Sequence, residues 1–300
     1  MVGPLTPGVR PQGVLRLGRC VFGPDERVVM AIVNRTPDSF YDKGATFSEG
    51  AALDAVDRAV AGGARIVDVG GVKAGPGVEV GEGEEIRRTA PFVAEVRSRY
   101  PDVVISVDTW RAGVGRAVCE AGADLLNDAW GGFDPGLAVV AGEFGVGLVC
   151  THTGGTVPRN RPRRGVAYED VMADILGQTL GLAERAVELG VPRESVIIDP
   201  AHDFGKNTRH SLEATRRLGE MVETGWPVLV SLSNKDFIGE TLDMPVRERL
   251  TGTLATTAVC AWLGARIYRV HEVPETRQVL DMVSSIQGTR PPAIAIRGIA

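Results

Sequence analysis

The 300-residue sequence has no long hydrophobic run: nothing in it approaches the roughly 20 consecutive apolar residues that a membrane-spanning helix needs. Residues 1–24 contain three arginines among glycines and prolines and lack the continuous apolar stretch of a secretory signal. We therefore expect no membrane partner and a cytoplasmic location.

Cysteine is scarce and positive charge is not in excess. The four cysteines lie far apart, at positions 20, 119, 150 and 260, which argues against a zinc knuckle, a redox pair or a disulfide framework and favours small buried side chains. The chain has 33 basic and 38 acidic residues, a net charge of −5 that disfavours nucleic acid as a partner. The one arginine cluster, at 159–164, is predicted to be a solvated surface loop.

What the sequence does contain is a series of eight short apolar, β-branched runs separated by helix-period segments. Near-continuous apolar character predicts parallel strands covered on both faces. The runs are residues 28–33, 65–69, 103–107, 124–126, 146–150, 196–198, 228–230 and 266–270. The helical stripes between them include 53–60, ending at Gly62, and 171–189, ending at Gly190, then Leu250, Leu254, Ala258 and Ala261, and finally Val279, Val283 and Ile286 behind Pro274.

Eight β-then-α units permit a closed barrel or an open doubly wound sheet, and the count favours closure. We predict an α/β fold, a (β/α)8 TIM barrel, over residues 27–300. Residues 1–26 are expected to form an extension whose short hairpin, around Gly18, caps the N-terminal end of the barrel. The length is natural for one domain of this kind.

Seven of the eight predicted strands are followed by a polar residue, and in a barrel these positions share one face, where active sites lie. The residues are Asn34, Asp108, Asn127, His152, Asp199, Lys235 and His271. Amides, carboxylates, imidazoles and an ammonium together favour recognition of an anionic small molecule. Taken singly, Asp108 and Asn127 are equally well explained as helix caps, and Lys235 as a surface lysine.

Three further features refine this site. Arg269 and His271 share one face of the last strand and need partners there, one of which an anion would supply. The segment 34–40 is either an ordinary turn or a grip for a magnesium diphosphate, and 70–77 is predicted to be a mobile loop. His202 and His210 have no comparable neighbours and are expected at the surface.

An ordered set of motifs resembles the dihydropteroate synthase family from Met30 to about Arg277. The strings are 30–40 (MAIVNRTPDSF), 66–71 (IVDVGG), 106–109 (SVDT), 122–128 (GADLLND), 198–200 (IDP), 204–206 (FGK), 233–239 (SNKDFIG) and 269–271 (RVH). Any one is weak, but the ordered set is highly specific. Members of this family join a hydroxymethyl dihydropterin diphosphate to p-aminobenzoate on a barrel, release diphosphate with the help of Mg²⁺, and commonly form homodimers through late helices.

The resemblance implies specific roles. Asp108, Asn127, Asp199 and Lys235 would read the edge of the pterin ring, with Phe204 near the ring. Asn34, Arg269 and His271 would hold the diphosphate, and Asn34 would also help to place Mg²⁺. Thr36 and Asp38 would belong to the first loop over the substrate. Carboxylates suit a ring edge rich in N–H donors, and cations with a metal stabilise charge on a leaving diphosphate.

The departures from the family pattern fall mainly on the aminobenzoate side. The usual Glu-Ser-Thr-Arg-Pro-Gly becomes 72–77 (VKAGPG), which puts Ala74 and Gly75 where a hydroxyl and a guanidinium are usual. Ser-Arg-Lys-Ser becomes 233–236 (SNKD), which puts Asp236 where a serine would meet the aminobenzoate. Met-His-Met becomes 151–153 (THT), and Gly-x-Gly-Phe-Gly-Lys becomes 201–206 (AHDFGK), with Asp203 beside the expected ring.

Three functions follow as hypotheses. The first is a dihydropteroate synthase-like paralogue that binds the pterin diphosphate with weak or lost synthase activity. The second is an active transferase that joins a pterin to p-aminobenzoate or to a different, cationic amine welcomed by Asp236. The third is a non-catalytic pterin- or phosphate-binding module.

Overall fold

The strands form a barrel. In the computed structural model, which describes residues 13–35, 49–73, 79–155 and 167–297, eight parallel strands lie in the order β8-β7-β6-β5-β4-β3-β10-β9. A bridge between Ile198 and Val228 joins the two ends of this series. The strands are β3 (Val28–Asn34), β4 (Ile66–Gly70), β5 (Val104–Asp108), β6 (Leu125–Asp128), β7 (Gly147–Thr151), β8 (Val196–Asp199), β9 (Leu229–Val230) and β10 (Ile267–Val270). The prediction of eight strands in a TIM barrel is confirmed.

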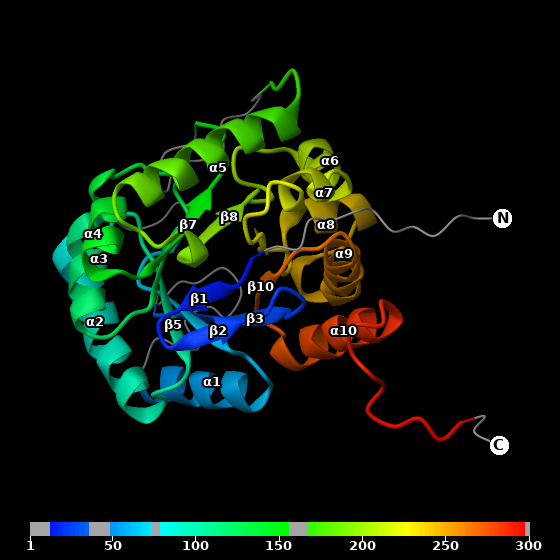
Figure 1. Cartoon of the computed structure of the whole chain (residues 1–300), viewed down its shortest axis with the longest axis horizontal. Helices are drawn as coiled ribbons and strands as arrows, with labels where there is room; N and C mark the ends of the chain where they lie inside the picture. Colours follow the sequence, from blue (N-terminus) through cyan, green and yellow to red (C-terminus); the bar gives the residue numbers. More distant parts are fainter. Residues whose placement is uncertain (1–12, 36–48, 74–78, 156–166, 298–300) are drawn as a thin grey trace.

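Helices surround the strands as an outer ring, which Figure 1 shows with α1 to α5 on one side and α6 to α10 on the other. They are α1 (Glu49–Ala61), α2 (Glu82–Arg99), α3 (Ala112–Glu120), α4 (Gly136–Phe144), α5 (Val171–Glu188), α6 (Thr208–Arg216), α7 (Leu218–Val222), α8 (Asp236–Leu242), α9 (Leu250–Trp262) and α10 (Val273–Ile286). Within the described ranges, no helix is both long and apolar enough to cross a membrane.

Alternate residues of each strand serve two separate cores, because successive side chains point to opposite faces of the sheet. In β3, Val29, Ala31 and Val33 pack outward against the helices, whereas Val28 and Met30 pack inside the barrel. The inner core is purely apolar only at the N-terminal ends of the strands. Above it the inward positions become polar, and this end of the barrel carries the site described below.

The predicted N-terminal hairpin is present. β1 (Leu15–Leu17) pairs with β2 (Cys20–Phe22) in antiparallel register, and the two strands lie across the barrel strands in Figure 1. Leu15, Leu17 and Phe22 are fully buried in the inner core, where each contributes about 1.5–3 kcal/mol of burial. The guanidinium of Arg266 donates to the carbonyls of Gly13, Phe22 and Gly23. The hairpin therefore plugs the N-terminal end of the barrel, as expected.

Two of the predicted helix stripes are partly wrong. The fully buried face of α9 consists of Thr253, Thr257, Cys260 and Ala261. Ala258 packs against the core as predicted but is only partly buried, as are Leu250 and Leu254. Thr257 can be buried because its hydroxyl donates to the Thr253 carbonyl at 2.8 Å. In α10, Ile286 is 60% exposed, although Val283 is buried as predicted. Of the cysteines, three are buried and Cys20 is partly exposed, and all four are free.

Candidate functional site

The strand register brings three of the expected residues, Asn34, Asp108 and Asn127, to one rim of the barrel. Asn34 pairs with Gly70, Gly70 with Asp108, and Asp108 with Asn127, across β3, β4, β5 and β6. On the neighbouring strands, Thr151 of β7 pairs with Asp199 of β8. The polar strand ends therefore gather around the barrel's C-terminal mouth, as the sequence predicted for this architecture.

A buried network centred on Asp68 of β4 links four strands under this mouth. The Asp68 carboxylate accepts hydrogen bonds from the Ser106 hydroxyl at 2.6 Å, the Asn127 amide at 3.2 Å and Arg269 Nε at 2.6 Å. The second arm of Arg269 reaches Asp108 at 2.9 Å. Sequence reasoning missed Asp68, although a carboxylate inside an otherwise apolar strand run was a usable signal. It also missed that two carboxylates of the chain itself supply the partners that Arg269 requires.

The network places two acids around one guanidinium, and the pKa values follow from that. Burial raises the pKa of Asp108 to about 7, against the lowering effect of Arg269 and with the support of the negative charge of Asp68. Burial lowers the pKa of Arg269, but the carboxylates of Asp68 and Asp108 more than offset this and hold it above its ordinary value. Asp108 can therefore exchange a proton near neutral pH, while Arg269 stays charged.

Asp199 and Lys235 form the opposite wall of the mouth. One Asp199 oxygen accepts the Ala201 N–H at 2.7 Å. Burial raises the pKa of Asp199, partly offset by that hydrogen bond and by Lys235. Lys235 donates to the His202 carbonyl at 2.6 Å, and its ammonium lies 4.5 Å from the centre of the Phe204 ring. The Asp199 carboxylate, the Lys235 ammonium and the Phe204 ring thus lie close together, although they come from the end of β8 and from the segments that follow β8 and β9.

Three aromatic rings extend this wall. The Phe204 ring packs edge to face on Trp130 at 5.5 Å, and Trp130 packs on Trp110 at 6.2 Å. Both tryptophans are almost fully buried, and they follow β6 and β5 within three residues of Asp128 and Asp108. Sequence reasoning selected Phe204 alone. The tryptophans carried a usable signal because each stands directly after a polar strand end.

The turn that carries Phe204 holds three residues in the left-handed region: Ala201 (φ 48°), Asp203 (φ 69°) and Gly205 (φ 62°). Glycine is usual at the first two positions in the family that the sequence resembles, and only glycine adopts this region without a penalty. The Asp203 carboxylate accepts from the Ser211 hydroxyl at 3.1 Å and from the Phe237 N–H at 3.3 Å. These contacts tie Asp203 to α6 and α8.

Replacing Ala201 by Gly should therefore stabilise the chain or leave it unchanged. A non-glycine residue in the left-handed region costs about 1–2 kcal/mol, which the substitution relieves. Glycine also makes the unfolded chain more flexible, and this opposes the gain by about 0.4–1 kcal/mol. We expect a gain of up to about 1.6 kcal/mol in the free energy of unfolding by urea. Gly81→Ala at the N-cap of α2, which has φ −72° and open space at Cβ, is the matched reference in ordinary backbone. Marked destabilisation by Ala201→Gly would show that the methyl group packs favourably there.

The end of β10 meets the segment after β9. His271 lies beside Ser233, whose hydroxyl is 3.1 Å from His271 Nδ1 and donates to Glu272 at 2.8 Å. Asp236, expected beside an acceptor molecule, has a side chain that is 66% exposed and pairs with Arg249 at 2.8 Å. A cationic acceptor would therefore compete with Arg249 for this carboxylate.

His202 and His152 differ from expectation, whereas His210 is partly exposed and forms a capping box with Asn207 at the start of α6. His202 was predicted at the surface and is fully buried, stacked on Phe237 at 5.5 Å with Nε2 3.0 Å from the Thr215 hydroxyl. That prediction is wrong because α6 and α8 fold over this turn, which no local pattern reveals. Burial lowers the pKa of His202 to about 3, so the ring is neutral. His152 is also fully buried, between Asp174 at 2.6 Å and Lys206 at 2.5 Å.

Several expected features lie outside the described residues. These are Thr36 and Asp38 in the first loop, Ala74 and Gly75 in the second, and the arginine cluster of 159–164.

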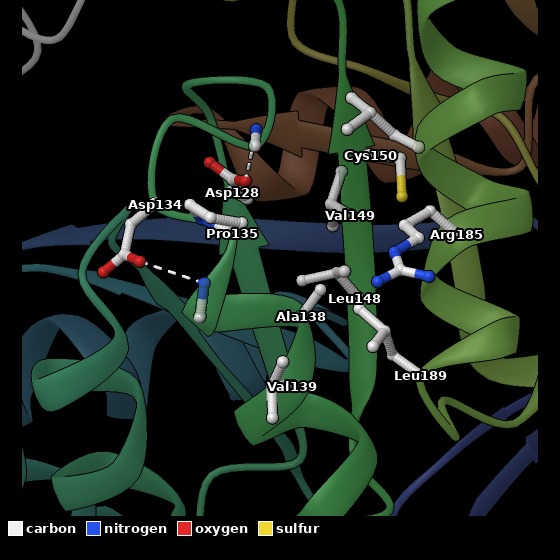
Figure 2. A pocket seen from close by; sticks show the side chains of 13 residues that line it. Asp128, Asp134, Pro135, Ala138, Val139, Leu148, Val149, Cys150, Arg185 and Leu189 are labelled. Atoms are coloured by element: carbon white, nitrogen blue, oxygen red, sulfur yellow. Dashed lines mark hydrogen bonds between the residues drawn. The ribbon is translucent and has the colours of Figure 1, made fainter.

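A cavity of about 270 Å³ lies elsewhere, between α4 and α5 (Figure 2). Its walls are mainly apolar and include Leu148, Cys150 and Leu189. The two carboxylates at its edge are bound to backbone amides: Asp128 accepts from Gly132 at 2.7 Å, and Asp134 from Gly136 at 2.9 Å. These acids hold the loop after β6, and Arg185, the other charged residue of the lining, pairs with Glu188 at 3.0 Å. The strand-end mouth is therefore the better candidate site.

Comparison with known proteins decides the family. The model of a family described as pterin binding enzyme matches residues 30–271, nearly the whole barrel. The chain belongs to the dihydropteroate synthase family. It is 60% identical over 286 residues to "Inactive dihydropteroate synthase 2" of Mycobacterium tuberculosis, which covers 94% of this chain and 90% of that protein.

Two solved structures support this assignment. The Yersinia pestis dihydropteroate synthase in a sulfonamide drug complex is 32% identical with a TM-score of 0.87, and the match covers 92% of this chain and 100% of that one. The same synthase with a pterine-sulfa conjugate is 30% identical with a TM-score of 0.81, covering 92% and 99%. The chain thus has the fold of a diverged dihydropteroate synthase, and the strand-end mouth is its candidate site.

Proposed function

We propose that this dihydropteroate synthase-like protein binds a 6-hydroxymethyl-7,8-dihydropterin diphosphate-type ligand at the barrel mouth and has weak or no synthase activity. The observation that carries the proposal is the convergence of Asp199, Lys235 and Phe204 on one wall opposite Asp108 and Asn127. Two carboxylates, an amide and an ammonium suit the donors and the carbonyl on the pterin edge. Phe204 offers the ring an apolar face.

The diphosphate would lie against Asn34, Arg269 and His271, on the β3–β10 side of the mouth. Parallel pairing of β10 with β3 supports this grouping. Arg269 is already held by Asp68 and Asp108, so an incoming anion competes with two carboxylates for it. We therefore expect a weaker diphosphate grip than a free guanidinium would give.

Magnesium would bind with the diphosphate. In the described part of the chain, no three His, Cys, Asp or Glu side chains are grouped as a metal site. We therefore expect Mg²⁺ to arrive with the diphosphate, because Mg²⁺ keeps several waters and is often held by phosphates plus one or two protein oxygens. Asn34 would supply the protein oxygen, and the ion would supply charge neutralisation at the diphosphate.

Weak or lost turnover is supported by what the acceptor side lacks. The family's usual hydroxyl and guanidinium after the second barrel strand are replaced at Ala74 and Gly75, and the loss of one such oriented group costs on the order of 10²-fold in rate. The Mycobacterium tuberculosis relative is named inactive. With Asp236 bound to Arg249, no feature of the described residues favours a transferase that uses another amine.

Calorimetric titration with the pterin diphosphate and Mg²⁺, followed by a pteroate assay with p-aminobenzoate, tests the proposal. We expect one binding site per chain and a kcat/KM at least about 100-fold below the ~10⁴ M⁻¹s⁻¹ at the low end of ordinary enzymes. The Bacillus subtilis dihydropteroate synthase, which is 37% identical to this chain, serves as the active control. Absence of pterin binding would reject the site, and ordinary turnover would restore the plain synthase function.

We also propose a homodimer through the α9–α10 face. Val259 and Trp262 on α9 and Met282 and Ile286 on α10 are 45–61% exposed, and the two helices lie side by side in Figure 1. A group of large apolar side chains left in water is typical of an interaction surface. We infer that a second copy of this chain covers this face, because members of the family commonly form homodimers through late helices.

A further inference from the structure

Three titratable side chains form a hydrogen-bonded relay next to the turn at 201–206. Asp174 on α5 is 2.6 Å from Nε2 of His152, which follows β7, and His152 Nδ1 is 2.5 Å from the Lys206 ammonium. The Asp174 side chain is 52% exposed, while His152 and Lys206 are 0% and 7% exposed. This relay of Asp174, His152 and Lys206 therefore connects solvent to the inner side of the turn that carries Phe204.

Three hydrogen-bond partners surround the Lys206 nitrogen: His152 Nδ1 at 2.5 Å, the Ala201 carbonyl at 3.1 Å and the Phe204 carbonyl at 3.0 Å. An ammonium donates to all three, whereas a neutral amine donates to the two carbonyls and accepts from His152 Nδ1–H. In the ammonium form, His152 Nδ1 accepts and its proton is on Nε2, where it is donated to Asp174. Loss of the ammonium charge keeps both carbonyl bonds but makes them weaker, because hydrogen bonds from a charged donor are roughly twice as strong as neutral ones.

The turn held by Lys206 positions the ligand-binding groups. Its Ala201 N–H donates to Asp199, its His202 carbonyl accepts from Lys235, and its Phe204 ring packs on Trp130. Two of its non-glycine residues are in the left-handed region, a strained conformation that persists only where surrounding contacts enforce it. The Lys206 ammonium bonds carbonyls inside this turn and is therefore one of those contacts.

We propose that Lys206 is the positioning residue of the pterin site: its ammonium closes the turn, and loss of one proton through His152 and Asp174 loosens Phe204 and weakens pterin binding. The proton leaves Lys206 for His152 Nδ1 as the Nε2 proton passes to Asp174 and then to water, so His152 ends neutral. The inference rests on the proposed pterin site. Lys206 itself acts through Asp199, Phe204 and Lys235.

The surrounding charges put this event near neutral pH. Burial lowers the pKa of Lys206 to about 7; Asp199, Asp174 and Asp203 raise it, and Lys235 lowers it. Burial and then Lys206 lower the pKa of His152 to about 4, against Asp174, so the imidazole stays neutral throughout. Above pH 7 the folded chain releases a proton that an unfolded lysine keeps until about 10.5. The contribution of Lys206 to stability therefore rises with pH while pterin affinity falls.

The ligand-free protein provides the first test, by imidazole ¹⁵N NMR from pH 6 to 9. We expect the His152 Nδ1 resonance, assigned by its loss in His152→Gln, to shift in one step near pH 7. The step should be absent in Lys206→Met. It should move to lower pH in Asp174→Asn, because Asp174 raises the lysine pKa, and stay in place in Glu184→Gln, an exposed charge on the same helix. A wild-type resonance without a step, or a step that survives in Lys206→Met, overturns the inference.

The second test measures affinity for 6-hydroxymethyl-7,8-dihydropterin, which carries no phosphate to titrate. Between pH 6 and 8.5 we expect roughly tenfold weaker binding to the wild type, the effect of one charged hydrogen bond. Asp108 also titrates near pH 7, so the comparison is with Lys206→Met, which should bind weakly at pH 6 and lose less with pH. Equal losses in both proteins contradict the inference. No binding at any pH rejects the pterin site, and the NMR result then stands independently.

Discussion

Replacing Asp199 by Asn is expected to reduce affinity for the pterin diphosphate by about 100-fold or more. The Asn oxygen can still accept the Ala201 N–H, so the turn keeps its hydrogen bond, but the charge and one acceptor are lost. An amide N–H would then face the N–H donors of the pterin edge. A charged hydrogen bond is worth about 1.5–3 kcal/mol, and the unpaired donors add to the loss. Isothermal titration at pH 7 measures it.

Folding stability separates this effect from simple damage to the protein. The pKa of Asp199 is raised in the folded chain, chiefly by burial, so the charged carboxylate is disfavoured there. Asp199→Asn should therefore be at least as stable as the wild type in urea at pH 7. The matched control is Glu188→Gln, a 66% exposed carboxylate on α5, which should bind normally. Normal binding by Asp199→Asn would remove Asp199 from the site.

Replacing Arg269 by Met is expected to destabilise the fold by about 3–5 kcal/mol at pH 7.5. The substitution leaves Asp68, which is fully buried, and Asp108 without their shared cation, and an uncompensated buried charge carries this penalty. The pKa of Asp108 is already about 7 against an ordinary 3.8, so the folded chain holds a proton that the unfolded chain releases between these values. The contribution of Asp108 to stability therefore falls as pH rises through that window.

The penalty should accordingly shrink towards pH 5, where Asp108 takes up a proton, and urea unfolding at both pH values measures it. Asp68→Asn/Arg269→Met should recover part of the loss because one of the orphaned charges is gone. Arg99→Met removes a half-exposed partner of Asp57 and should change stability by no more than about 1 kcal/mol. A loss below about 1 kcal/mol in Arg269→Met at pH 7.5 would show that water or another cation compensates the two acids.

The fold could be predicted well from the sequence because barrel strands carry their signal locally. Each strand has an apolar run covered on both faces, and each lies within one or two residues of its predicted position. The hairpin followed from apolar residues around Gly18. Where prediction failed, burial depended on a distant element: α6 and α8 cover His202, and threonine hydroxyls bonded within α9 allow polar side chains to form its core face.

The sequence predicted the polar strand ends of the candidate site, but neither Asp68 and the two tryptophans beside them nor the pairings between side chains. The chain order of polar strand ends named the residues that gather at the mouth, because a closed barrel brings all strand ends to one rim. Asp68 and Arg269 are 201 positions apart in the sequence, and their contact exists only because β10 returns beside β3.

The sequence by itself therefore determined the barrel, its capping hairpin, its family and the polar residues at the strand ends, because periodicity and motif order are local properties. Only the tertiary structure decided which charges neutralise one another, that Ala201 and Asp203 occupy a left-handed turn, and that Lys206 holds that turn from below. Those features depend on side chains meeting across strands that are distant in sequence, and the distance between them is fixed only when the barrel closes.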